Sequence, residues 1–123
     1  HHDHHRHAAY VLANADAAGF SQSQQRRLAE LVLVQRGGLR KVEASLAQPG
    51  FAWQALCLRL AAIGCPARAP GDASAFALRR RDDDATLTLA PGWADANPRT
   101  LYLLQEEAVA WERTGVIRLA VRR

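Results

Sequence analysis

Several residue types are scarce in this chain of 123 residues, and each scarcity excludes a class of protein. There is no methionine and a single lysine, and the two cysteines, Cys57 and Cys65, stand close together with no apolar signal sequence before them. We therefore expect reduced thiols in the cytoplasm and no disulfide framework. The longest apolar stretch, residues 52–63, is interrupted by Gln54 and Arg59. A membrane span needs roughly 20 uninterrupted apolar residues, so no integral membrane segment is expected.

Aromatic residues are also few, and the charge is only moderately one-sided. They make up 7% of the chain and do not alternate with its arginines, unlike the stacking rings and cations of a single-strand nucleic-acid binder. We predict no nucleic-acid partner. The formal net charge of +4 still favours an anionic partner of some kind. Because the sequence opens without Met inside a charged cluster, we expect it to be a segment of a longer protein.

Helix patterns dominate the first half of the chain. A helix is predicted to begin directly at Ala8. Ser21, followed three residues later by Gln24, predicts a capped helix that starts at Gln22 and ends at the pair Gly37-Gly38. Helical spacing predicts that this helix buries Leu28, Leu31 and Val32, and that the short helical turn after it buries Leu39, Val42 and Leu46. It also predicts an apolar helix over residues 51–64 that buries Phe51, Ala55, Leu56, Leu60 and Ile63. Cys57, on that apolar helix, is expected to be inert.

Strand patterns appear only in the second half. Residues 65–74 hold two prolines and a glycine without periodicity and predict a linker. Residues 75–80 and 85–90 alternate apolar and polar side chains around an Asp-rich turn and predict a hairpin. Asn97-Pro98 then predicts a helix start, Gly115 its end, and residues 116–121 a last strand. The predicted fold class is α+β, with a helical segment over 1–70 and a small β-β-α-β domain over 71–123.

Five histidines in the first seven residues are the most distinctive feature. A purification tag would be an unbroken run, whereas Asp3 and Arg6 interrupt this one. A zinc site needs three or four ligands on a packed scaffold, and outside this cluster only Cys57 and Cys65 are available, so we expect no metal in this segment. Imidazoles beside Arg6 at a helix start can instead bind a phosphate oxygen through hydrogen bonds, charge and the helix dipole.

The segment HRHAAYVLANADAAGFSQSQQ resembles the C-terminal region of the exopolyphosphatase and guanosine-pentaphosphate phosphatase (Ppx/GppA) family. In that family an H-x-H-[SAG]-x-Y helix is followed by an N-[SA]-[DN]-x-x-G-F-[SN] turn into the next helix. The positions that carry the resemblance are His1, His5, His7, Ala8, Tyr10, Asn14, Asp16, Gly19, Phe20 and Ser21. Beyond residue 25 the similarity is looser, and Gln35 stands where the family usually has a histidine.

The resemblance implies the C-terminal segment of an exopolyphosphatase, with an HD-like helical part, whose parent hydrolyses terminal phosphate from inorganic polyphosphate. The catalytic residues and Mg would belong to the parent's N-terminal domains, so no catalytic residue or cofactor is expected here, and the segment alone should be inactive. It would bind polyphosphate, contact those domains and form a homodimer. The expected polyphosphate-binding residues are His1, His5, Arg6, His7, Arg36, Arg40, Lys41 and Arg59, with Arg68 as a further cation. A guanosine-pentaphosphate phosphatase segment and a non-catalytic dimerisation module remain open alternatives.

Overall fold

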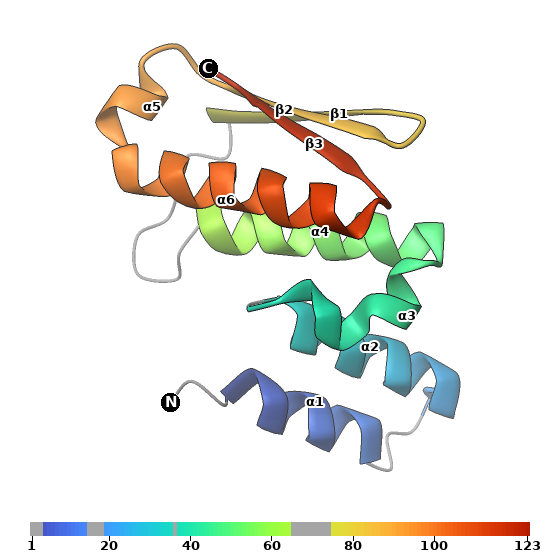
Figure 1. Cartoon of the computed structure of the whole chain (residues 1–123). Helices are drawn as coiled ribbons and strands as arrows, with labels where there is room; N and C mark the ends of the chain where they lie inside the picture. The colour runs from blue at the N-terminus through green and yellow to red at the C-terminus, as the bar shows by residue number, and fades with distance from the viewer. Residues whose placement is uncertain (1–3, 15–18, 36, 65–74) are drawn as a thin grey trace. The chain divides into compact units, whose positions relative to one another are not determined.

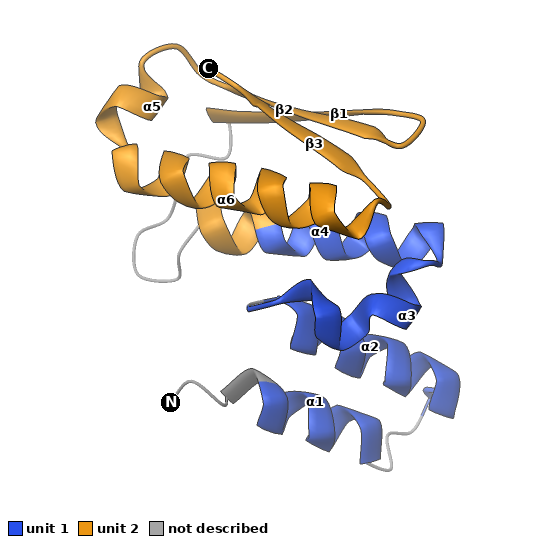
Figure 2. Cartoon of the chain, viewed as in Figure 1, with its two compact units in different colours: residues 1–59 blue, residues 60–123 orange. Residues whose placement is uncertain are grey.

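Helices occupy the first part of the chain and a three-stranded sheet the last, which confirms the predicted α+β class (Figure 1). This computed structural model describes residues 4–14, 19–35, 37–64 and 75–123, with only the backbone of His4 and His5. The chain divides into two units, residues 1–59 and 60–123 (Figure 2). The predicted linker at 65–74, and the predicted domain boundary after residue 70, lie outside the described residues.

Unit 1 begins with α1 (His4–Asn14) and α2 (Gln22–Val34). The start of α2 is as predicted, because the Ser21 hydroxyl accepts from the Gln24 amide at 3.1 Å and the Gln24 side chain accepts from the Ser21 amide at 2.8 Å. The predicted start of α1 at Ala8 was wrong, since the helix already includes His4. No helix-breaking residue separates the two positions, and each residue added to an existing turn gains a hydrogen bond at little cost.

The buried face of α2 differs from the predicted one. Leu28 is 38% exposed, while Gln25, Ala29 and Val34 are buried. Packing between α1 and α2 explains the difference. The Gln25 carboxamide donates to the Leu12 carbonyl of α1 at 3.2 Å, and Ala29, one turn further along α2, is buried as well. A polar side chain is therefore buried with its hydrogen bond made, which hydrophobic spacing alone does not predict.

The rest of unit 1 follows the predicted apolar pattern closely. The 3-10 helix η1 (Leu39–Val42) and the short α3 (Glu43–Leu46) bury Leu39, Val42 and Leu46, as predicted. Helix α4 (Pro49–Gly64) begins in unit 1 and ends in unit 2. Its predicted core positions are buried except Ile63, which is half-buried: Phe51, Ala55, Leu56 and Leu60. Cys57 is exposed.

Unit 2 contains the sheet, in the order β1 (Phe76–Arg81), β2 (Asp84–Leu89), β3 (Arg118–Arg122). The predicted hairpin is present: β1 and β2 pair antiparallel with Leu78 opposite Leu87, and Asp82 turns the chain with φ 52°. β3 pairs parallel to β2. Parallel pairing requires a crossover between the two strands, and the helices of unit 2 provide it.

Two helices connect β2 to β3. The short α5 (Trp93–Ala96) was not predicted from the sequence. The longer α6 (Pro98–Thr114) has the predicted start and ends at Gly115, with φ 69°. Asn97 does not cap α6 with its side chain, because its amide donates to the Trp93 carbonyl at 3.0 Å. Helix α6 packs against β3 and buries Trp111 completely, with the indole N–H donating to Glu107 at 2.9 Å.

Candidate functional site

Arg59 of α4 forms the base of a cationic site in unit 1. Only 7% of the residue is exposed, and its Nη1 donates to the Val34 carbonyl at 2.9 Å and to the Gly37 carbonyl at 2.7 Å. Val34 is the last residue of α2. Carbonyls at a helix C-terminus lack intrahelical donors and carry partial negative charge, so a buried guanidinium satisfies both needs. Arg59 thus fixes the turn that follows α2.

Gly37 makes this turn possible. Its φ is +81°, a conformation that L side chains rarely adopt. A Cβ at this position would also stand 3.3 Å from Nζ of Lys41. The turn leads directly into η1, which carries Arg40 and Lys41. The glycine therefore allows the Lys41 ammonium group to lie against the same turn that Arg59 holds.

A third cation, Arg6, comes from α1. Partial burial of the ammonium group lowers the pKa of Lys41 below its ordinary value, although the residue as a whole is exposed, and the positive charges of Arg59 and then Arg6 lower it further. Coulomb interactions weaken as the distance between the charges grows, so both guanidinium groups lie near enough to act on the Lys41 ammonium group. Residues 6, 41 and 59, far apart in sequence, therefore converge in unit 1. We call Arg6, Lys41 and Arg59 the cation cluster.

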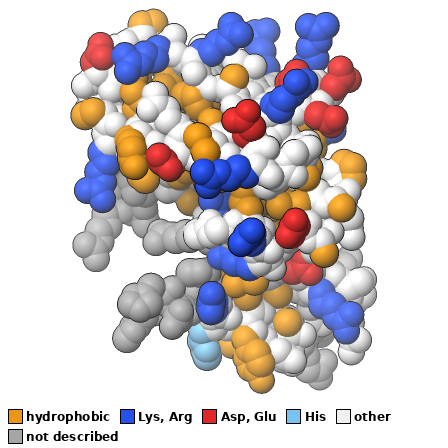
Figure 3. Space-filling view, in the orientation of Figure 1, with side chains coloured by type: hydrophobic (Ala, Val, Ile, Leu, Met, Phe, Trp, Pro, Cys, Tyr) orange, Lys and Arg blue, Asp and Glu red, His pale blue; other side chains and the backbone are white. Residues whose placement is uncertain are grey.

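The other predicted binding residues that the structure describes are located by the element that carries them, without a known contact to the cation cluster. His7 and Arg40 are both exposed, one beside Arg6 on α1 and the other beside Lys41 on η1. Figure 3 shows Lys and Arg side chains gathered on this part of unit 1 with a histidine near them. His5 lies on α1, but its side chain is not described. His1, Arg36 and Arg68 fall outside the described residues.

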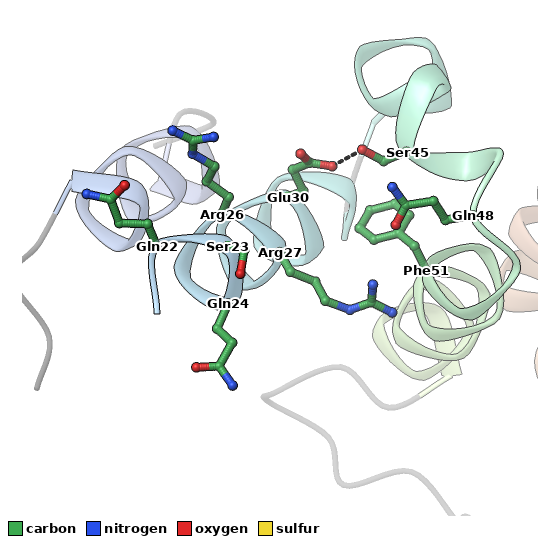
Figure 4. Close-up of a pocket in the computed structure, with 9 residues that line it drawn as sticks. All are labelled: Gln22, Ser23, Gln24, Arg26, Arg27, Glu30, Ser45, Gln48 and Phe51. Carbon is green, nitrogen blue, oxygen red and sulfur yellow. Dashed lines mark hydrogen bonds between the residues drawn. The ribbon is translucent and has the colours of Figure 1, made fainter. Parts of the chain in front are cut away.

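A groove of about 600 Å³ lies elsewhere in unit 1, between α2 and the residues that lead into α4 (Figure 4). Arg27 lies 5.9 Å from the centre of the Phe51 ring and donates through Nε and Nη2 to the side-chain oxygen Oε1 of Gln54, at 3.1 and 2.7 Å. Glu30 accepts from the Ser45 hydroxyl. These contacts join α2, α3 and α4. These contacts were not predicted from the sequence, although Arg27 and Glu30, one turn apart on α2, place two charged side chains on one face of the helix.

Two classes of site find no support among the residues that the structure describes. Within them, no three histidine, cysteine or acidic side chains come together as metal ligands would. No helix among them is both long and apolar enough to cross a bilayer. The chemistry that the cation cluster offers is the binding of an anion.

Comparisons with known proteins agree with the resemblance noted in the sequence. Residues 1–108 match the family model described as Ppx/GppA phosphatase, domain III. A guanosine-5'-triphosphate,3'-diphosphate pyrophosphatase of Aeromonas hydrophila subsp. hydrophila is 37% identical over 114 residues, which are 89% of this chain and 23% of that protein. The protein of the same description from Photobacterium profundum is 34% identical over 104 residues, 83% of this chain and 21% of that protein. This chain thus spans about a quarter of the length of these relatives. The family match, which covers most of the chain, shows that it belongs to the Ppx/GppA phosphatase family.

Proposed function

We propose that this chain is the substrate-binding and dimerisation segment of an exopolyphosphatase, whose parent enzyme removes terminal phosphate from inorganic polyphosphate. The observation that carries the proposal is the convergence of Arg6, Lys41 and Arg59 in unit 1. Three like charges held together repel one another, and a phosphate chain placed between them replaces that repulsion with attraction. The site then favours a ligand of high negative charge density.

The three cations have different roles in this proposal. Arg59 is buried, is engaged with the carbonyls of Val34 and Gly37, and adds its positive charge to the site. Arg6 and Lys41 are exposed and make the phosphate contacts. Among the other predicted ligands, His7 lies beside Arg6 on α1 and Arg40 beside Lys41 on η1, and both extend the binding surface. His1, His5 and Arg36 are proposed as further phosphate ligands.

The parent's chemistry is also part of the proposal. We place the catalytic carboxylate and the Mg ion in N-terminal catalytic domains that this segment contacts, and we assign the helical part an HD-like fold. The working enzyme is a cytoplasmic homodimer. The described residues supply phosphate contacts and no hydrolytic step, so the chain by itself releases no phosphate from polyphosphate in the presence of Mg.

A second candidate substrate is guanosine pentaphosphate, and the descriptions of the relatives favour it. Both candidates present several phosphates, and the cation cluster fits either. They differ in the nucleoside, which polyphosphate lacks. Competition between the two ligands for the same chain therefore separates them.

The test is binding of fluorescently labelled long-chain polyphosphate to the full chain over a range of salt concentrations. Arg6→Gln combined with Lys41→Gln should weaken binding at least about tenfold and flatten the salt dependence, because two phosphate contacts are lost. The control, Arg26→Gln combined with Arg99→Gln, removes the same charge from exposed helix positions and should change affinity by less than about threefold. Equal losses in both variants would show that only net charge matters and would remove the cation cluster from the proposal.

A competition experiment measures which of the two substrates the chain prefers. If unlabelled guanosine pentaphosphate displaces labelled polyphosphate at lower phosphate concentration than polyphosphate itself does, the second candidate replaces the first. The opposite order supports the exopolyphosphatase assignment.

A further inference from the structure

The sheet of unit 2 has one face covered by its own helix and one face open. Along β2, Ala85, Leu87 and Leu89 are buried, while the alternate positions Thr86 and Thr88 point the other way. Successive side chains of a strand alternate between the two faces of a sheet. The open face therefore carries the two threonines in its central strand.

Strand pairing assigns the neighbours of these threonines. On β1, Arg79 pairs with Thr86 and Arg81 with Asp84, so both arginines share the open face. On β3, Arg118 pairs with Asp84 and Arg122 with Thr88, again on that face. All four arginines are exposed. Lys and Arg side chains are prominent over these strands in Figure 3. The open face is thus a row of hydroxyls bordered on both sides by guanidinium groups.

The dimensions of this face suit a thin polyanion. Neighbouring strands are about 4.8 Å apart, so the two arginine-bearing strands are separated by roughly 10 Å. Along a strand, Arg79 and Arg81 of β1 are spaced about 6.7 Å apart, and Arg118 and Arg122 of β3 about 13 Å apart. One acidic group, Asp84, lies on the face, and Arg118 pairs with it at 2.7 Å. Four arginines against one aspartate leave the face with a net charge of +3.

From this arrangement we propose that the open sheet face of unit 2 is a second binding track for linear inorganic polyphosphate, separate from the cation cluster of unit 1. Guanidinium groups bind phosphate oxygens in pairs, and threonine hydroxyls donate to the same oxygens. The remaining outward positions, Ala77 and Ala120, are small. The face therefore offers no aromatic ring for base stacking and no apolar side chain for insertion into a bilayer. A bare phosphate chain along β2 needs neither.

The identity of the ligand rests on the proposed function, whereas the site itself does not. The chain provides a separate reporter for each site. Lys41 is the only lysine, so its ammonium signal in NMR reports on the cation cluster, and the methyl signals of Thr86 and Thr88 report on the open sheet face. Titration of the full chain with long-chain polyphosphate should shift both sets of signals.

Variants then locate the second track. Arg79→Gln combined with Arg122→Gln removes one guanidinium from each border and should weaken the polyphosphate affinity read at Thr86 and Thr88 about tenfold, with the salt slope reduced by roughly 1.4. The Lys41 response should stay unchanged. The matched control is Arg80→Gln combined with Arg113→Gln, since Arg80 points to the other face of β1 and Arg113 lies on α6. This control should leave the threonine response within about threefold of the parent chain.

Three results would overturn the inference. The first is a threonine response that the Arg79 and Arg122 changes do not weaken. The second is a Lys41 shift without any threonine shift, which would leave the proposed function in place and remove only the second track. The third is a stronger threonine response to duplex RNA of equal phosphate concentration, which would make the face a nucleic-acid surface. Failure of both reporters to respond to polyphosphate would instead contradict the proposed function itself.

Discussion

Replacing Arg59 with methionine tests whether its buried guanidinium holds the turn between α2 and η1. Methionine keeps the unbranched stem and removes both charge-assisted hydrogen bonds, to the carbonyls of Val34 and Gly37. A hydrogen bond to a charged group contributes about 1.5–3 kcal/mol, and the carbonyl of buried Val34 would lose its charged donor. Since contributions within one turn are not additive, we expect a loss of about 3 kcal/mol in the free energy of unfolding of unit 1.

Urea denaturation followed by backbone amide NMR signals of α1 and α2 measures this loss for unit 1 by itself. With a urea dependence near 2 kcal/mol per molar, the midpoint should fall by about 1.5 M at an unchanged slope. Arg99→Met at an exposed position of α6 is the control and should cost less than about 0.5 kcal/mol. An Arg59→Met chain as stable as this control would refute the capping role and, with it, our account of how the cation cluster is positioned.

Three further predictions concern other parts of the structure. Gly37→Ala should destabilise unit 1 by about 1 kcal/mol or more, because φ is +81° and Nζ of Lys41 lies 3.3 Å from the new Cβ. Gly38→Ala is the control and should be neutral in thermal unfolding, because Gly38 has φ −71° and open space around its Cβ position. Folding lowers the pKa of Lys41, so the unfolded chain keeps this proton to higher pH than the folded chain does. The free energy of unfolding should therefore rise with pH from the folded pKa toward the ordinary value of 10.5. Urea midpoints measured between about pH 8 and 11 should show this rise in the parent chain and lack it in Lys41→Gln. Trp111→Phe removes the hydrogen bond to buried Glu107 and part of the core of unit 2 and should cost about 2 kcal/mol; a urea midpoint equal to that of the parent chain would contradict this packing account.

Local signals in the sequence predicted the elements well wherever a residue determines its own backbone. Ser21 with Gln24 placed the start of α2, and Gly115 placed the end of α6, because a side-chain cap and a left-handed φ involve only the neighbouring few residues. The β-hairpin was predictable for the same reason, since its two strands are separated only by the Asp-rich turn. Short α5 was missed because four residues give too little periodicity to recognise.

Which face of a helix is buried depended instead on its partner. The pattern in α2 pointed to Leu28, but Leu28 is exposed, whereas Ala29 and Gln25, which is hydrogen-bonded to α1, are buried. For the proposed binding residues, too, the sequence identified the side chains but not their surroundings. Composition and resemblance selected Arg6, Lys41 and Arg59 individually, and the sequence gives each the same formal charge.

The sequence by itself determined the family, the α+β class and the positive charge available for a polyanion. The tertiary structure alone decided that Arg59 is buried and caps a helix while Arg6 and Lys41 stay exposed, and that four arginines on β1 and β3 share one face of the sheet. The physical reason is distance. Charge and hydrogen-bond energies depend on separation in space, and residues 6, 41 and 59, like strands β1 and β3, are brought together only by the packing of segments that are remote along the chain.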